Sequence, residues 1–120
     1  MGRLSTYDVS HEFDGWDLWG RKYVLLGMQY FIEICDNDAL KEKIIKSMCN
    51  QADYIISKIG NEDGKKQINS CTRYWRGLNS SSILEPVVRL YSLTGSKKYF
   101  DFAKYIVDCG ATDVENIFKL

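Results

Sequence analysis

The sequence lacks the features that mark metal sites, membrane spans and nucleic-acid binding. Its 120 residues include one histidine, His11, and four cysteines without a C-x-x-C pair, which is a poor signature for a zinc or redox site. No apolar run reaches the ~18 residues of a membrane span, and the N-terminus M-G-R-L-S-T-Y-D has no apolar signal-peptide core. Sixteen basic residues balance sixteen acidic ones, so no charge field attracts nucleic acid. We therefore expect neither a membrane nor a nucleic acid among the partners of this chain.

The cysteines are spread along the chain, at Cys35, Cys49, Cys71 and Cys109. Three of them fall in segments with helical periodicity, where cysteine usually behaves as a small buried hydrophobe. We interpret all of them as reduced thiols, which favours a cytoplasmic location.

The sequence does contain enough apolar residues, 45% with 13% aromatics, for one small packed domain. Hydrophobic periodicity predicts helices over residues 17–35, 38–59, 82–93 and 97–109. The first and third are apolar on most sides and should be buried nearly all round, whereas the second and fourth are amphipathic. Gly20 and Gly27 lie two turns apart in the first helix, so another backbone is expected to approach that side.

The alternation of buried and amphipathic helices repeats as two hairpins. The hairpins also resemble each other, as in A-D-Y-I from Ala52 and A-K-Y-I from Ala103. A hairpin repeat of roughly 50 to 60 residues indicates a solenoid or a toroid. Apolar inner helices beside amphipathic outer ones favour an all-α fold, an incomplete arc of an (α/α)6 toroid over residues 1–120. Four helices cannot close such a ring, so we expect a fragment whose apolar edges associate with the missing part of the toroid or form a homo-oligomer.

Two stretches carry a family resemblance, W-D-L-W-G-R-K-Y-V-L-L-G-M from Trp16 and W-R-G-L-N-S-S-S-I-L-E-P-V-V-R-L-Y from Trp75. Together they resemble the N-terminal part of the α/α-toroid catalytic domain of the β-L-arabinofuranosidase-type glycosidases, glycoside hydrolase family 127 and its relatives. The resemblance covers roughly residues 7–110. It implies a retaining hydrolase of arabinofuranosides or related sugars, with this chain contributing part of the sugar-binding wall.

The resemblance also implies a cysteine nucleophile and a zinc ion held by a glutamate and several cysteines, in motifs downstream of the matched region. The sequence does contain E-I-C at Glu33 to Cys35, but at the end of the first predicted helix, where the family has a generic junction. We interpret this match as coincidence. We therefore expect no metal ligands within this chain, and no catalysis by the chain alone.

Glu85 is the candidate catalytic residue, because its slot matches a glutamate that many family members show near the sugar. The residues alone allow an ordinary alternative, in which Ser82 and Glu85 form the capping box S-x-x-E and Glu85 pairs with Arg89 at i,i+4. Pro86 fits a helix that starts one or two residues later than Ser82 better. Both interpretations of Glu85 stay open.

The candidate substrate-binding residues are Trp16, Asp17, Trp19, Arg21, Lys22, Trp75, Arg76 and Asn79. Indole faces stack on sugar rings, although most tryptophans pack in cores or at their rims. Asp17 and Arg21 either line a polar cleft or pair with each other at i,i+4. Asn79 either donates to sugar hydroxyls or belongs to the polar residues that cap a helix. Arg21-Lys22 stands where many members have His-Lys, which removes an acid–base histidine.

Two rival functions stay open. An α-solenoid interaction module would bind a peptide in an aromatic groove lined by the three tryptophans. Another toroid enzyme, such as an epimerase or an unsaturated-glucuronide hydrolase, would carry acid–base histidines or carboxylates on its inner helices. The single histidine argues against the epimerase, and we expect His11 itself at the surface.

Overall fold

The computed structural model describes residues 2–119 and consists of helices joined by short irregular segments. Four longer helices form its body: α1 (Asp17–Ile34), α2 (Asp38–Lys58), α4 (Leu84–Thr94) and α5 (Lys97–Asp108). The remaining elements are the short helix α3 (Leu78–Ser81) and the 3-10 turns η1 (Val9–His11), η2 (Ile68–Ser70) and η3 (Tyr74–Gly77). No strand occurs within residues 2–119. The all-α prediction is confirmed, and each of the four predicted helices is present.

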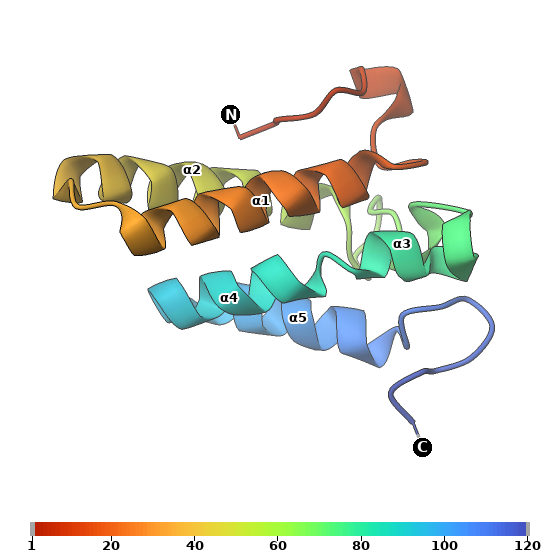
Figure 1. The fold of residues 1–120 in the computed structure, drawn as a ribbon. Helices are drawn as coiled ribbons and strands as arrows, with labels where there is room; N and C mark the ends of the chain where they lie inside the picture. Colours follow the sequence, from red (N-terminus) through yellow and green to blue (C-terminus); the bar gives the residue numbers. More distant parts are fainter. Residues whose placement is uncertain (1, 120) are drawn as a thin grey trace.

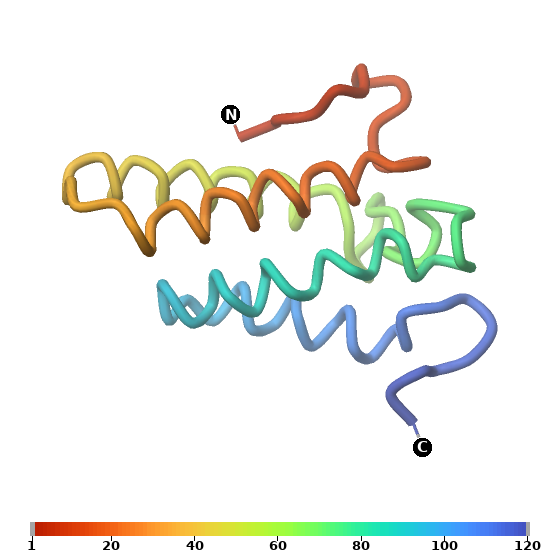
Figure 2. The backbone as a smooth tube through the Cα atoms, viewed as in Figure 1, coloured from red at the N-terminus to blue at the C-terminus, as the bar shows by residue number. Residues whose placement is uncertain are grey.

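The longer helices form two hairpins that lie side by side (Figure 1). In the first hairpin α1 packs against α2, and in the second α4 packs against α5. The hairpins meet mainly through α1 and α4, which lie toward the viewer, while α2 and α5 lie behind them. The segments η2, η3 and α3 fill one end, and the chain before α1 runs back along the first hairpin (Figure 2). This arrangement is that of two neighbouring hairpins of an α/α toroid, with α1 and α4 as the inner helices.

The core lies between the two hairpins and draws on every longer helix. Its largest fully buried side chains are those of Leu18, Leu25, Met48, Ile55, Ile59, Ile68, Ile83, Leu90, Tyr99 and Ile106. The Tyr99 hydroxyl donates to the Asp53 carboxylate at 2.9 Å, so the buried ring reaches a polar partner on α2. Desolvation, followed by hydrogen bonding with the Cys49 side chain and then with Asp53, raises the pKa of Tyr99. The N-terminus of α2 is capped by Asn37, whose side chain accepts from the backbone N–H of Leu40 at 3.0 Å.

The start of α4 differs from the prediction. The capping box requires Ser82 as N-cap, but α4 begins at Leu84 and its N-cap, Ile83, makes no side-chain capping bond. Ser82 instead follows α3, and its hydroxyl donates back to the carbonyl of Asn79 at 2.7 Å. The later start places Pro86 third in the helix, where its missing N–H has no intrahelical partner to lose. The capping-box interpretation of Glu85 is therefore wrong, and the restriction at Pro86 explains why.

The prediction that α1 is buried nearly all round is also wrong. Neighbours cover the sides of α1 that face α2, α3 and α4, and one further side stays exposed. On that side lie the apolar residues Tyr23, Val24, Tyr30, Phe31 and Ile34, of which Ile34 is 81% exposed. An apolar composition on all sides is typical of a buried helix, but it does not say whether this chain supplies all the neighbours.

Gly20 and Gly27 lie on the same exposed side of α1. A Cβ added to either would find no heavy atom within 4 Å. The predicted approach of another backbone to these glycines therefore does not occur within residues 2–119.

We expect Gly27→Ala to stabilise the fold by about 1 kcal/mol, because alanine loses less backbone entropy in a helix and nothing crowds its methyl group. Chemical denaturation measures this change in unfolding free energy. Gly20→Ala, on the same exposed side of α1, is the second test. An unchanged or lower unfolding free energy for both variants would contradict the prediction.

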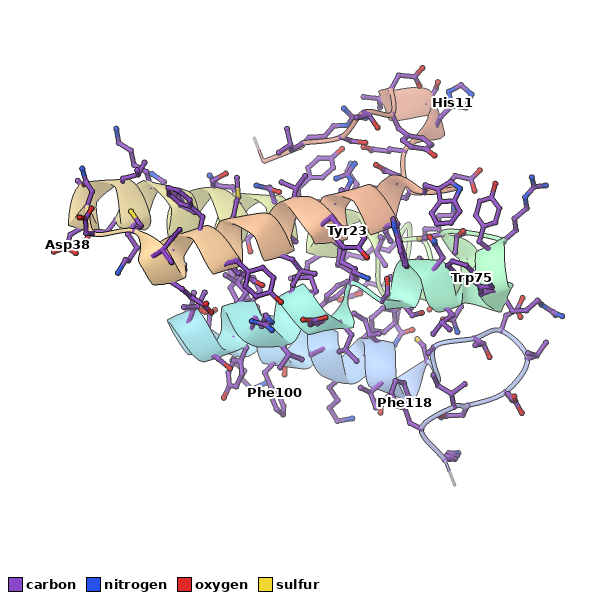
Figure 3. All side chains as sticks on the ribbon, in the orientation of Figure 1. His11, Tyr23, Asp38, Trp75, Phe100 and Phe118 are labelled. Atoms are coloured by element: carbon purple, nitrogen blue, oxygen red, sulfur yellow. The ribbon has the colours of Figure 1, made fainter. Side chains whose placement is uncertain are left out.

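A second apolar surface lies on the far side of α5. Tyr91 and Phe100 pack with ring centroids 5.4 Å apart, and Phe100 projects away from α1 (Figure 3). Surfaces of this kind are where association of proteins begins. Self-association of the chain stays a prediction. Among residues 2–119, no helix combines the length and the apolar character needed to cross a bilayer.

Candidate functional site

All three tryptophans of the chain meet at the end of the molecule where α1 begins. Trp16 stacks on Tyr74, with ring centroids 4.7 Å apart and planes at 28°. Trp75 contacts Trp16 and Trp19 edge-on or tilted, at centroid distances of 5.6 and 5.8 Å. Trp19 also contacts Tyr23, one turn further along α1, at 5.4 Å. These five rings (Trp16, Trp19, Tyr23, Tyr74 and Trp75) form the aromatic cluster, whose position Figure 3 marks through Tyr23 and Trp75.

The aromatic cluster is at the surface and does not belong to the core. Trp75 is 58% exposed and Trp16 is 39% exposed, whereas the buried core residues lie between the hairpins. The spacing of Trp16 and Trp19 predicted that these two share a face of α1. Trp75, 56 positions beyond Trp19, joins them only through the fold. Open indole faces held by neighbouring rings form a rigid apolar platform.

The turn that carries Trp75 has an unusual backbone. Trp75, Arg76 and Gly77 have φ of 53°, 57° and 99°, in the left-handed region that costs a residue with a side chain about 1–2 kcal/mol. The segment after α5 holds this turn in place. The Arg76 Nε donates to the Asp113 carboxylate at 3.0 Å, and the backbone N–H of Asp113 donates to the Arg76 carbonyl at 2.8 Å. Arg76 therefore faces Asp113, and its predicted contact with substrate remains a prediction.

Two cations lie over rings of the aromatic cluster. The Lys22 ammonium is 4.1 Å from the ring centroid of Trp19 and 4.7 Å from that of Tyr23. The Arg73 guanidinium carbon is 5.5 Å from the ring centroid of Tyr74. A cation held over an aromatic face in this way is attracted by the ring quadrupole. Lys22 was predicted as a site residue, whereas Tyr23, Tyr74 and Arg73 were not.

Asp17 and Arg21 form a buried ion pair between α1 and the chain segment before it. The Arg21 guanidinium lies 3.2 Å from the Asp17 carboxylate, and the exposed fractions of the two side chains are 3% and 1%. Arg21 also contacts Glu12 at 3.2 Å, and Glu12 accepts from Arg3 at 2.6 Å and from the Tyr54 hydroxyl at 2.8 Å. Of the two interpretations, the structure thus shows the i,i+4 pair. Both residues also line a depression of about 230 Å³ between α1 and the N-terminal segment.

Glu12 was missed because nothing in the segment before α1 marks it. Burial raises its pKa, but the hydrogen bonds from Tyr54 and Arg3 and the nearby guanidinium groups outweigh burial and hold the pKa below its usual range. Its neighbour His11 is 75% exposed and contacts Asp8 at 2.9 Å. The surface position expected for His11 is confirmed.

Glu85 lies at the surface of α4, on the side of the second hairpin that meets α1. Its carboxylate accepts from the Arg89 Nε at 3.2 Å, which is the predicted i,i+4 pair, and the side chains are 51% and 39% exposed. The Arg89 guanidinium also lies 5.1 Å from the ring centroid of Tyr30 on α1. Tyr30 is two helical turns, about 10 Å, beyond Tyr23 on the same side of α1. Glu85, one turn before Arg89 on α4, therefore lies on the same face of the inner helices as Tyr30.

Asn79 lies inside the fold. It is fully buried in α3, and neither its amide nitrogen nor its amide oxygen has a hydrogen-bond partner. The flanking hydroxyls are bonded, Ser80 to the carbonyl of Ile68 at 2.6 Å and Ser81 to that of Ala111 at 2.9 Å. A buried amide without partners costs about 1–3 kcal/mol. The structure does not bring Asn79 to the exposed face where the aromatic cluster and Glu85 lie.

Comparison with known families identifies the domain to which this face belongs. The family model described as beta-L-arabinofuranosidase, GH127 catalytic domain, matches residues 4–119. The chain belongs to this family. The match includes the aromatic cluster, the Asp17–Arg21 pair and Glu85 in one continuous stretch. No curated protein and no solved structure matched the chain significantly.

The family resemblance implies a zinc ion, and the described residues do not fit one. Within residues 2–119, no three side chains of His, Cys, Asp or Glu gather where they could hold a metal. Cys71 is fully buried, and desolvation raises the pKa of its thiol to about 12, whereas zinc binds the thiolate. Cys35 follows α1 near Asp38, at the end of the molecule opposite Trp75 (Figure 3).

Proposed function

We propose that this chain forms part of the saccharide-binding wall of a glycoside hydrolase of the arabinofuranosidase type. The observation that supports this most is the meeting of all three tryptophans at an exposed end of the inner helices, in a chain that belongs to a GH127 catalytic-domain family. Indoles held by their neighbours lose little freedom when a ligand stacks on them. The apolar faces of a furanose or pyranose ring match such a platform.

Glu85 is the proposed catalytic carboxylate of this wall. Arg89 holds its side chain from one side, and the ring of Tyr30 confines Arg89 in turn. We propose that Glu85 meets the sugar whose ring stacks on the aromatic cluster, and that Trp16, Trp19 and Trp75 provide the stacking. In the same proposal the nucleophile comes from residues other than those of this chain, so the chain alone binds sugar without hydrolysing it.

Saturation-transfer NMR with L-arabinose tests the binding. We expect saturation transfer from the wild-type chain to arabinose, a loss of at least about tenfold in affinity for Trp75→Ala, and a smaller loss for Glu85→Gln. A tenfold loss is about 1.4 kcal/mol, within the roughly 1–3 kcal/mol that a base stacked on an aromatic side chain contributes. Phe118→Ala and Glu42→Gln are the matched controls, since both residues are exposed and lie away from the cluster and from Glu85.

The rival function, a peptide-binding α-solenoid module, predicts a different result. Its aromatic cluster would bind apolar or aromatic peptide side chains, and a folded chain would show no transfer to any sugar. Circular dichroism of the same sample establishes that the chain is folded. No transfer from a folded chain would contradict the proposed function and favour the solenoid module.

A further inference from the structure

The aromatic cluster is bordered by two cations that are not neutralised. The rings of Trp19, Trp16 and Tyr74 follow one another in contact, with Lys22 over the first and Arg73 over the last. Within residues 2–119, neither Lys22 nor Arg73 forms an ion pair with a carboxylate. Both charges therefore stay available at the two ends of a row of rings.

The other cations nearby are already paired. Arg21 contacts two carboxylates, and Arg76 contacts Asp113 at 3.0 Å. The difference matters because a paired cation attracts a further anion weakly, whereas an unpaired one attracts it with its full charge. Among the described residues, Lys22 and Arg73 are thus cations held against the rings that can meet a ligand anion.

A depression beside Tyr74 extends the surface at its Arg73 end. Its volume is about 280 Å³, and its lining consists of Tyr7, His11, Asp14, Gly15, Arg73 and Tyr74. Asp14 is the carboxylate of this lining, and its oxygen accepts from the backbone N–H of Gly15 at 2.8 Å. The depression offers room for a group larger than a hydroxyl next to the guanidinium.

We propose that the aromatic cluster with Lys22 and Arg73 selects anionic saccharides, namely sugars that carry a carboxylate, over their neutral counterparts. The inference rests on the proposed function, since it requires that sugars stack on the cluster. A hexuronate on the rings places its carboxylate at the ring edge, where the cation that the same ring holds can meet it. Because three rings separate the two cations, an oligosaccharide with carboxylates on more than one unit gains from both.

The matched ligands are D-galacturonate and D-galactose, which differ only in a carboxylate against a hydroxymethyl group. All three tryptophans are in the cluster, so the chain labelled with 5-fluorotryptophan gives three fluorine resonances that each report on it. Titrations are followed for wild type, for the double variant Lys22→Gln with Arg73→Gln, and for the control Lys43→Gln on α2. Lys43 is exposed like the other two cations but lies away from the rings.

We expect wild type and Lys43→Gln to bind galacturonate about threefold more tightly than galactose at low salt, the size of one exposed ion pair. The preference should disappear in the double variant and shrink in 0.3 M salt, because exposed charges are screened. Equal binding of the two sugars by wild type, or a preference that persists in the double variant, would overturn the inference and leave the proposed function intact. If a folded chain bound none of galacturonate, galactose and arabinose, the proposed function itself would be refuted.

Discussion

Replacing Arg21 by methionine should destabilise the chain by about 3–5 kcal/mol, the usual cost of removing one partner from a buried ion pair. Methionine keeps the volume of the side chain, but it leaves the carboxylates of Asp17 and Glu12 buried without their shared cation. The ring of Phe13, 4.4 Å from the guanidinium carbon, loses its cation as well. Since domains of this size are stable by 5–15 kcal/mol, a large part of the variant should be unfolded at 37 °C.

Urea denaturation at pH 7 measures this loss, and Arg89→Met is the matched control. Arg89 also follows a carboxylate at i,i+4, but the Glu85–Arg89 pair is half-exposed, so its removal should cost less than about 1 kcal/mol. Similar losses for both variants would show that the buried network contributes no more than a surface pair. Loss of the cation–π contacts alone cannot account for the full difference, because Arg89 has one as well, to Tyr30.

The pH dependence separates the charge from the packing. The pKa of Glu12 is lower in the folded chain than its ordinary value, so Glu12 stabilises the fold above its ordinary pKa and this contribution is lost as the pH falls through the folded pKa. A protonated carboxyl group no longer needs a cation. The difference in unfolding free energy between wild type and Arg21→Met should therefore become smaller in acid. If the substitution only impaired packing, this difference would be the same at every pH.

The hydrophobic pattern of the sequence predicted where the helices lie, but not how much of each helix is buried by its neighbours. The alternation of apolar and polar residues in α2 and α5 depends on helical period, so their bounds were found within one residue. The capping-box spacing of Ser82 and Glu85 put the predicted start of α4 at Ser82, whereas Pro86 favoured a later start, and the helix begins at Leu84. The exposed side of α1 was missed because composition does not reveal which neighbours are present.

The residues of the candidate site that lie along one helix could be predicted from their spacing. The contacts between residues from distant segments could not. Trp16, Tyr23 and Tyr30 recur at steps of seven, a pattern that marks one side of a helix and that would have extended the candidates along α1. The meeting of Trp75 with Trp16 depends on a turn whose left-handed backbone has no signal at Trp75 or Arg76. Residues with side chains keep such a conformation only where their surroundings fix it.

Gly77 is the residue that makes this turn possible, and we expect Gly77→Ala to cost about 3 kcal/mol. Its φ of 99° disfavours any side chain, and an added Cβ would lie 2.9 Å from the carbonyl oxygen of Asn69. Asn69 cannot readily give way. Its amide donates to the carbonyls of Cys109 at 2.9 Å and Thr112 at 3.1 Å, and its side-chain oxygen accepts from Ser81 at 3.1 Å.

Gly95→Ala is the control for the backbone term alone. Gly95 ends α4 with a φ of 68°, and nothing lies within 4 Å of an added Cβ, so this change should cost about 1 kcal/mol. Denaturation gives both costs, and tryptophan emission shows whether the aromatic cluster has moved, because each tryptophan belongs to it. We expect a changed emission spectrum for Gly77→Ala and an unchanged one for Gly95→Ala. Equal costs with unchanged emission in both would mean that the turn accommodates a side chain, and that Trp75 does not depend on Gly77 for its place beside Trp16 and Trp19.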